Sequence, residues 1–254
     1  ERIGVNFDLA TTLSQRAEYR YGPWGCFAWW WENAFGEEED SEAVEEADYE
    51  EPRWWGYQPD PTPPTGIPLG PDGRPQFLTV PKEYSSKIGD GLKIRFLLEE
   101  VQTLDSTERK ENAARAVMRW AMIVRSLYGP ETANQWSGAN VQRDRFGRPL
   151  PGQSKTEVPS KKMWELADDE ALTIAGGRLQ LVTLPASESP IALLRSIPEK
   201  YPKCGILAEA HYTLGLYYQT RQQFPQALRE YRKLIELYPK ENRATNARTQ
   251  IQRI

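Results

Sequence analysis

Residues that could bind a metal or transfer a proton are few and scattered in this sequence. The chain contains one histidine, His211, and two cysteines, Cys26 and Cys204, in unrelated sequence contexts. Zinc sites built from Cys and His need about four such ligands, and covalent haem needs a Cys-x-x-Cys-His motif, so both are excluded within the chain. The two cysteines could form one disulfide, but nothing in their spacing requires it.

The other common catalytic arrangements are also missing. A Ser-His-Asp triad would have to use His211, whose position on the apolar face of a predicted helix indicates a packing role. Neither a Walker loop nor a Gly-x-Gly-x-x-Gly motif occurs in the sequence. We therefore expect no catalytic residue, no metal and no cofactor, and a protein that is not an enzyme.

Two acidic clusters could supply carboxylates. Residues 37–51 hold ten acidic and no basic residues, but not in the order of a calcium-binding loop, so a solvated segment is expected. Asp168-Asp169-Glu170 is interpreted as a charge cluster at a helix end rather than as a catalytic pair. Without residues 37–51, the net charge of −4 becomes −4 + 10 = +6. This positive charge forms no single block, which argues against nucleic-acid binding.

Tryptophans gather in two places near the start of the chain. Their large apolar rings must be covered by protein, by a partner or by a ligand. They could pin this segment to the rest of the protein, stack on a glycan, or dock onto a protein partner. We interpret them as possible docking aromatics and keep glycan binding as an alternative: Trp29, Trp30, Trp31, Trp54 and Trp55.

The elements that must position these residues begin with an irregular segment. Residues 1–85 are rich in aromatic, acidic and proline residues, and the prolines of 61–68 exclude a regular helix or a central strand there. We expect residues 1–85 to form a long irregular arm. No stretch reaches the roughly 18 consecutive apolar residues of a membrane-spanning helix.

A helical hairpin is predicted over 86–130. Apolar residues recur at helical spacing in 91–104 and again up to about residue 128. Asp105, followed three residues later by Glu108, predicts the start of the second helix.

The next region, 131–185, predicts a polar loop, a short helix and a β-hairpin. The short helix is expected within 161–172. Two strands, at 172–175 and 178–184, flank Gly176-Gly177, and consecutive glycines supply the positive φ angles that a tight turn requires.

Residues 186–254 carry the most specific pattern. From Ala208 to Pro239, two predicted helices carry a leucine and several small and aromatic residues at fixed offsets, at Leu214, Gly215, Tyr218, Phe224, Ala227 and Tyr231. This pattern resembles the tetratricopeptide repeat, a helix–turn–helix unit of 34 residues. His211 and Leu234 depart from the family pattern, but both fit the packing. Small residues at Gly215 and Ala227 should let the two helix backbones approach closely.

Neighbouring units are visible on both sides, as a solenoid requires. Pro190 precedes Pro225 by 35 residues in a similar context, and a helix containing Ala244, Ala247 and Ile251 follows. The sequence stops within this last helix, so we expect an open apolar face there. We therefore also expect the chain to belong to a larger polypeptide or assembly.

The predicted fold is thus mainly α, with tetratricopeptide-like helical hairpins over about 189–254. The resemblance implies a concave surface that binds a peptide, a tail or a neighbouring subunit. It implies that this surface is lined by Glu209, Tyr212, Leu216, Gln219 and Thr220. The expected function is that of a protein–protein interaction scaffold.

A second resemblance covers more of the chain. The aromatic-rich start, the segment 164–185 and the terminal repeat together resemble the N-terminal region of large bacterial alpha-2-macroglobulin-like envelope proteins. This implies an extracytoplasmic location, in the periplasm or cell envelope, and a region of a protease-trapping protein as an alternative function. The Cys-x-Glu-Gln thioester motif of that family is missing from the sequence.

Overall fold

The computed structural model describes Asn6, Ala10, residues 70–128 except 73, 75, 78 and 86–87, and residues 161–175 and 178–254. Most of the predicted arm, with all five docking tryptophans, and the predicted loop at 131–160 lie outside these residues. The described part is mainly helical and includes a two-stranded antiparallel sheet. Its α-helices are α2 (Asp90–Leu104), α3 (Glu111–Tyr128), α5 (Pro190–Lys200), α6 (Leu207–Thr220), α7 (Phe224–Leu237) and α8 (Asn242–Arg253). None of these helices combines the length and apolarity needed to cross a bilayer.

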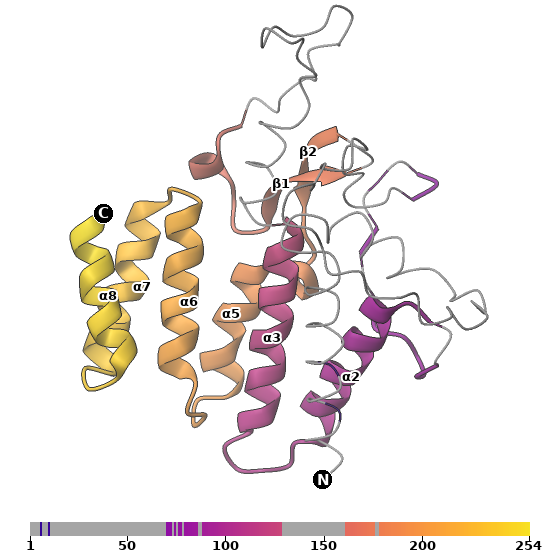
Figure 1. Ribbon diagram of the computed structural model, residues 1–254, viewed down its shortest axis with the longest axis horizontal. Coiled ribbons are helices and arrows are strands. Elements are labelled where there is room, and N and C mark those ends of the chain that lie inside the picture. Colours follow the sequence, from indigo (N-terminus) through magenta and orange to yellow (C-terminus); the bar gives the residue numbers. More distant parts are fainter. Residues whose placement is uncertain are drawn as a thin grey trace, which may run out of the picture.

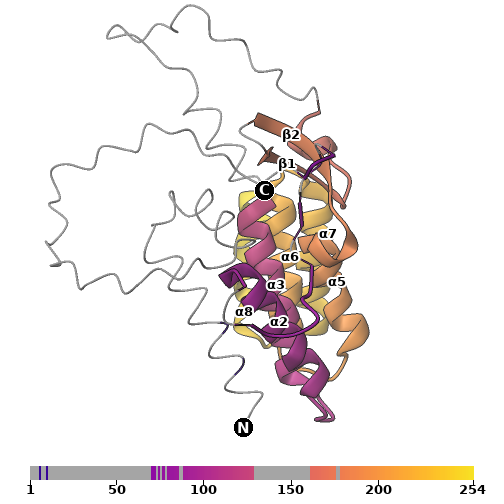
Figure 2. The same cartoon turned by 90° about the vertical axis from the view of Figure 1, so that its right-hand side faces the viewer.

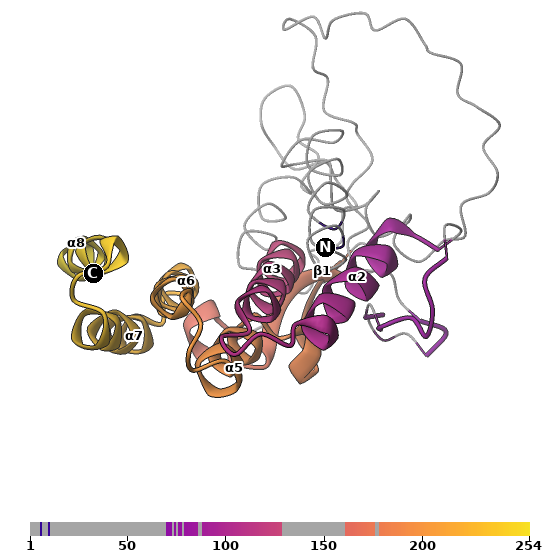
Figure 3. The same ribbon diagram turned by 90° about the horizontal axis from the view of Figure 1, so that it is seen from below.

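The helices form a row in which successive members run in opposite directions (Figure 1). Seen from below, the row alternates between two layers, with α3, α6 and α8 in one layer and α5 and α7 in the other (Figure 3). Helix α2 packs on the opposite side of α3 from α5 and α6 (Figure 3). The small sheet lies at one end of α3 (Figure 2).

Helix α3 joins two hydrophobic cores. Its Ala116, Trp120 and Val124 face α2 and the sheet, whereas its Ala114 and Val117 face α5 and α6. Trp120, which the periodicity did not single out, is fully buried and donates its indole N–H to the backbone oxygen of Ser187 at 2.9 Å. The helical hairpin predicted over 86–130 is present as α2 and α3, and α3 packs against α5.

The predicted start of the second helix needs correction. Helix α3 begins at Glu111, later than the Asp105 signal indicates. Asp105 still caps this helix, because its Oδ2 accepts the backbone N–H groups of Asn112 at 2.9 Å and Ala113 at 3.0 Å. Glu108 takes no part in the cap and instead pairs with the Lys203 ammonium at 2.5 Å.

The predicted short helix over 161–172 is also wrong in extent. The chain forms only a three-residue 3₁₀ helix, η1 (Met163–Glu165), before strand β1 (Glu170–Ala175). Strand β1 pairs antiparallel with β2 (Arg178–Thr183), as the predicted hairpin requires. Asp168 and Asp169 therefore precede a strand rather than end a helix.

Helices α6 and α7 approach each other at Gly215. A Cβ atom on Gly215 would lie 2.5 Å from Cε1 of Tyr231, a distance that no relaxed structure allows. Tyr231 and Ala227 are fully buried in the same contact. The predicted role of the small residues is confirmed.

Helix α8 differs from expectation on its outer side. Ala244 and Ala247 are buried, as the spacing predicts. The remaining positions do not form an open apolar face, because the exposed side of the helix is polar: Thr245, Asn246, Arg248, Thr249, Gln252 and Arg253.

Candidate protein-binding surface on helices α6 and α8

All five predicted contact residues lie on α6, and α8 packs beside that helix. At the start of α6, Glu209 forms an ion pair with Arg243 of α8, with Oε1 and Nη2 2.8 Å apart. Both side chains remain more than one third exposed. This pair is a bidentate carboxylate–guanidinium contact, which fixes the spacing of the two helices and remains accessible to solvent.

Tyr212 forms the floor of this surface rather than an open contact. Its side chain is buried, and its ring centroid lies 5.9 Å from that of Tyr231. The guanidinium carbon of Arg243 lies 5.0 Å above the Tyr212 ring, in cation–π geometry. Tyr212 therefore positions Arg243, and a partner would touch the arginine first.

The far end of α6 carries amides. Tyr231 donates its hydroxyl to Gln219 Oε1 at 2.8 Å, and Gln219 Nε2 donates to Gln250 Oε1 of α8 at 3.3 Å. Leu216 is half-buried between the two ends, and Thr220 is exposed. The surface thus combines an ion pair, an apolar centre and a pair of amides.

Two residues of this surface, Arg243 and Gln250, were not predicted from the sequence. Their partners on α6 are Glu209, 34 residues earlier, and Gln219, 31 residues earlier. These separations are close to one repeat period, so the repeat spacing could have identified them.

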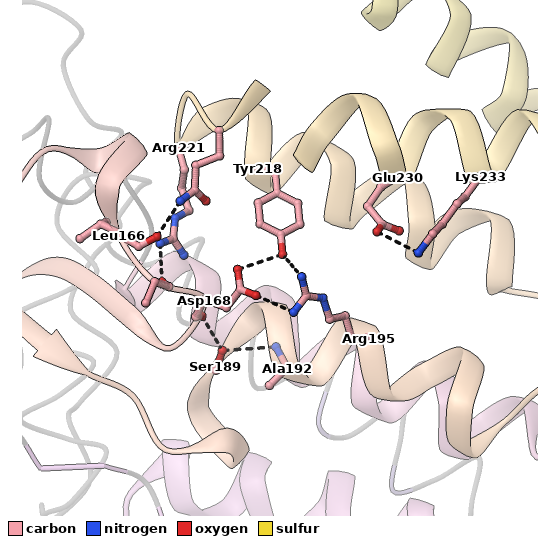
Figure 4. Close-up of polar contacts among 11 residues, drawn as sticks. Leu166, Asp168, Ser189, Ala192, Arg195, Tyr218, Arg221, Glu230 and Lys233 are labelled. Atoms are coloured by element: carbon pink, nitrogen blue, oxygen red, sulfur yellow. Dashed lines mark hydrogen bonds and ion pairs between the residues drawn. The ribbon is translucent and has the colours of Figure 1, made fainter. Parts of the chain in front are cut away.

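A polar network that is partly open to solvent fixes α6 from its other side (Figure 4). Asp168 accepts from the guanidinium of Arg195 at 2.5 Å and from the hydroxyl of Tyr218 at 3.0 Å, and Arg195 also donates to that hydroxyl. Ser189, the N-cap of α5, donates to the backbone oxygen of Asp168 at 3.1 Å. Burial and the Asp168 charge raise the pKa of Tyr218, so its hydroxyl keeps the proton that it donates.

Side chains from the turn between α6 and α7 form hydrogen bonds with the segment before β1. Arg221 donates to the backbone oxygen of Ala167 at 2.7 Å, and Gln223 donates to that of Leu166 at 2.6 Å (Figure 4). Both side chains are buried. These contacts assign Asp168 and its neighbours a structural role that joins the hairpin to the helices.

His211 has the packing role predicted from its position. Its Nδ1 lies 3.0 Å from Oε2 of the buried Glu230. The Oε1 atom of Glu230 accepts from Lys233 at 3.3 Å (Figure 4). Burial alone would raise the pKa of Glu230, but the bonds from His211 and Lys233 outweigh it and lower the pKa. Cys204 is buried and free. In the described segments, no group of three or more His, Cys, Asp and Glu side chains is placed to hold a metal ion.

Comparison of the chain with protein-family models, with curated proteins and with solved structures found no match. The resemblance to tetratricopeptide and alpha-2-macroglobulin-like proteins therefore rests on the residue pattern alone.

Proposed function

We propose that the protein is a non-enzymatic scaffold that binds another protein through a tetratricopeptide-like region at about 189–254. Three features support this proposal. The helices alternate between two layers, the contact of Gly215 with Tyr231 matches the packing that the repeat pattern demands, and residues one period apart meet across α6 and α8.

The observation that carries the proposal is the exposed Glu209–Arg243 pair beside the Gln219–Gln250 amides. A guanidinium held over an aromatic ring is already ordered, so a partner carboxylate can bind it with little loss of side-chain entropy. Glutamine amides can donate to and accept from the backbone of an extended peptide. The occupant is therefore an extended segment of a partner protein that carries at least one acidic side chain.

Quantitative affinity capture tests this function. Arg243→Glu reverses the charge at the ion pair and places two carboxylates side by side. Arg229→Glu makes the same change of charge at an exposed position of α7, in the other layer, and serves as the matched control. We expect Arg243→Glu to lose a partner that both the wild type and Arg229→Glu retain. Identical partner sets for all three proteins would contradict the proposal.

The proposed extracytoplasmic location rests on the combined resemblance of the aromatic-rich start, residues 164–185 and the terminal repeat to envelope proteins. Cell fractionation of the native source, with cytoplasmic and envelope marker proteins as references, tests this part of the proposal. Recovery with the cytoplasmic markers would contradict it.

A further inference from the structure

A second candidate site lies away from the α6–α8 surface. A cleft of about 310 Å³ opens between α2 and α5, with α3 at its base. Its volume falls at the lower end of the roughly 300–1,000 Å³ typical of small-molecule sites. Small residues at the start of α5 and before it, among them Ala186 and Ala192, leave this space open.

Arg95 of α2 lines the cleft and is a buried cation without a hydrogen-bond partner. The residue is 6% exposed, and its Nε is buried with nothing to donate to. The Glu99 carboxylate lies 3.9 Å from Nη1, which exceeds hydrogen-bond length. Buried guanidinium groups are normally paired, because an unpaired charge in the interior is costly.

Trp120 fixes the direction of Arg95. The guanidinium carbon lies 4.5 Å from the centre of the indole ring, so one face of the guanidinium is covered. The indole is itself held by its bond to the Ser187 backbone oxygen at 2.9 Å. Stacking leaves the edges of a guanidinium, which carry its N–H groups, available to an acceptor in its plane.

The charges around the cleft favour an anion. Lys200, at the end of α5, lines the cleft together with Arg95, and Glu99 is the acidic residue of its lining. Glu188 lies near Arg95, but burial raises the pKa of Glu188 to about 8 despite the arginine charge. Burial thus favours the neutral form of Glu188, which does not cancel the charge of Arg95.

We propose that this cleft binds a small organic carboxylate, whose anionic group contacts Arg95 and Lys200 and whose apolar body lies against Val117 and Leu193. The carboxylate supplies the in-plane acceptors that Arg95 lacks. The apolar lining sets the size of the body, and the cleft accommodates a molecule as large as benzoate or hexanoate.

Titration calorimetry with these two carboxylates, and with benzamide and hexanamide as neutral analogues, tests the proposal on the full chain. We expect saturable binding of at least one carboxylate with a Kd on the order of 10⁻⁴ M, and weak or no binding of its amide. Arg95→Met should weaken binding by at least about tenfold, because it removes the charge-assisted bonds and keeps the length of the side chain. The exposed Arg229→Met provides the control for loss of one positive charge.

Thermal unfolding of each variant checks that it folds. If Arg95→Met does not fold, Lys200→Met at the exposed edge of the cleft gives the same test, with an expected weakening of a few-fold. The proposal would be overturned if neither benzoate nor hexanoate bound saturably. Equal binding by the wild type and the cleft variants would overturn it as well.

Discussion

Replacement of Gly215 by alanine tests the close contact of α6 and α7. In an ordinary helix interior, Gly→Ala stabilises by about 1 kcal/mol through helix propensity. Here the new Cβ would lie 2.5 Å and 2.7 Å from two carbons of the Tyr231 ring, which is fully buried. Such overpacking costs roughly 1–3 kcal/mol or more, so its cost exceeds the free energy gained through helix propensity. We expect a net destabilisation of about 1–2 kcal/mol.

Urea denaturation followed by far-ultraviolet circular dichroism measures this change. The control is the same substitution in a Tyr231→Leu background, where the smaller side chain leaves room for the methyl group. There Gly215→Ala should be neutral or stabilising, so the double-mutant cycle should show a coupling of at least about 1 kcal/mol. Stabilisation of the wild-type background by Gly215→Ala would refute the packing described for this contact.

Three further changes test other contacts, each by its own readout. Burial alone would raise the pKa of Asp105, but hydrogen bonds from Thr107 and the start of α3 outweigh it and lower the pKa. The contribution of Asp105 to stability is therefore present above its unfolded pKa of about 3.9, and it is lost as the pH falls through the lower folded pKa. Asp105→Asn should therefore lower the urea midpoint at neutral pH and lessen its decline in acid. Arg221→Met should speed hydrogen exchange in β1 more than in α7, because it frees the Ala167 carbonyl. Glu230→Ala should cost about 1–3 kcal/mol in urea denaturation, since it removes the partner of the His211 ring.

The C-terminal helices could be predicted from the sequence because local signals and packing signals agree there. Pro190 and Pro225 mark helix starts, where a missing N–H costs nothing. Gly215 and Ala227 lie where two helices touch, and each fits a pattern with few alternatives. The glycine pair between β1 and β2 gave an equally local signal for the hairpin.

The features that could not be predicted from the sequence depend on contacts between residues far apart in the chain. Residues 161–172 carry helix formers, but Arg221 and Gln223 bind the backbone oxygens of Ala167 and Leu166, directly after the 3₁₀ helix. No local pattern reveals a donor more than fifty residues away. Asp105 caps α3 from a preceding loop, a geometry outside the usual capping spacing. The packing of Trp120 between two elements and the burial of Tyr212 under Arg243 likewise arise only in the folded chain.

Site-specific photo-crosslinking in the native source tests the proposed scaffold function most directly. A photo-reactive residue at Thr220, which is exposed at the end of the α6–α8 surface, should crosslink to a discrete protein partner. The same residue at Arg229, exposed on α7 in the other layer, should not capture that partner. In combination with Arg243→Glu, the crosslink at Thr220 should be lost. Capture of the same partner from both positions, or an unchanged crosslink in Arg243→Glu, would contradict binding through this surface.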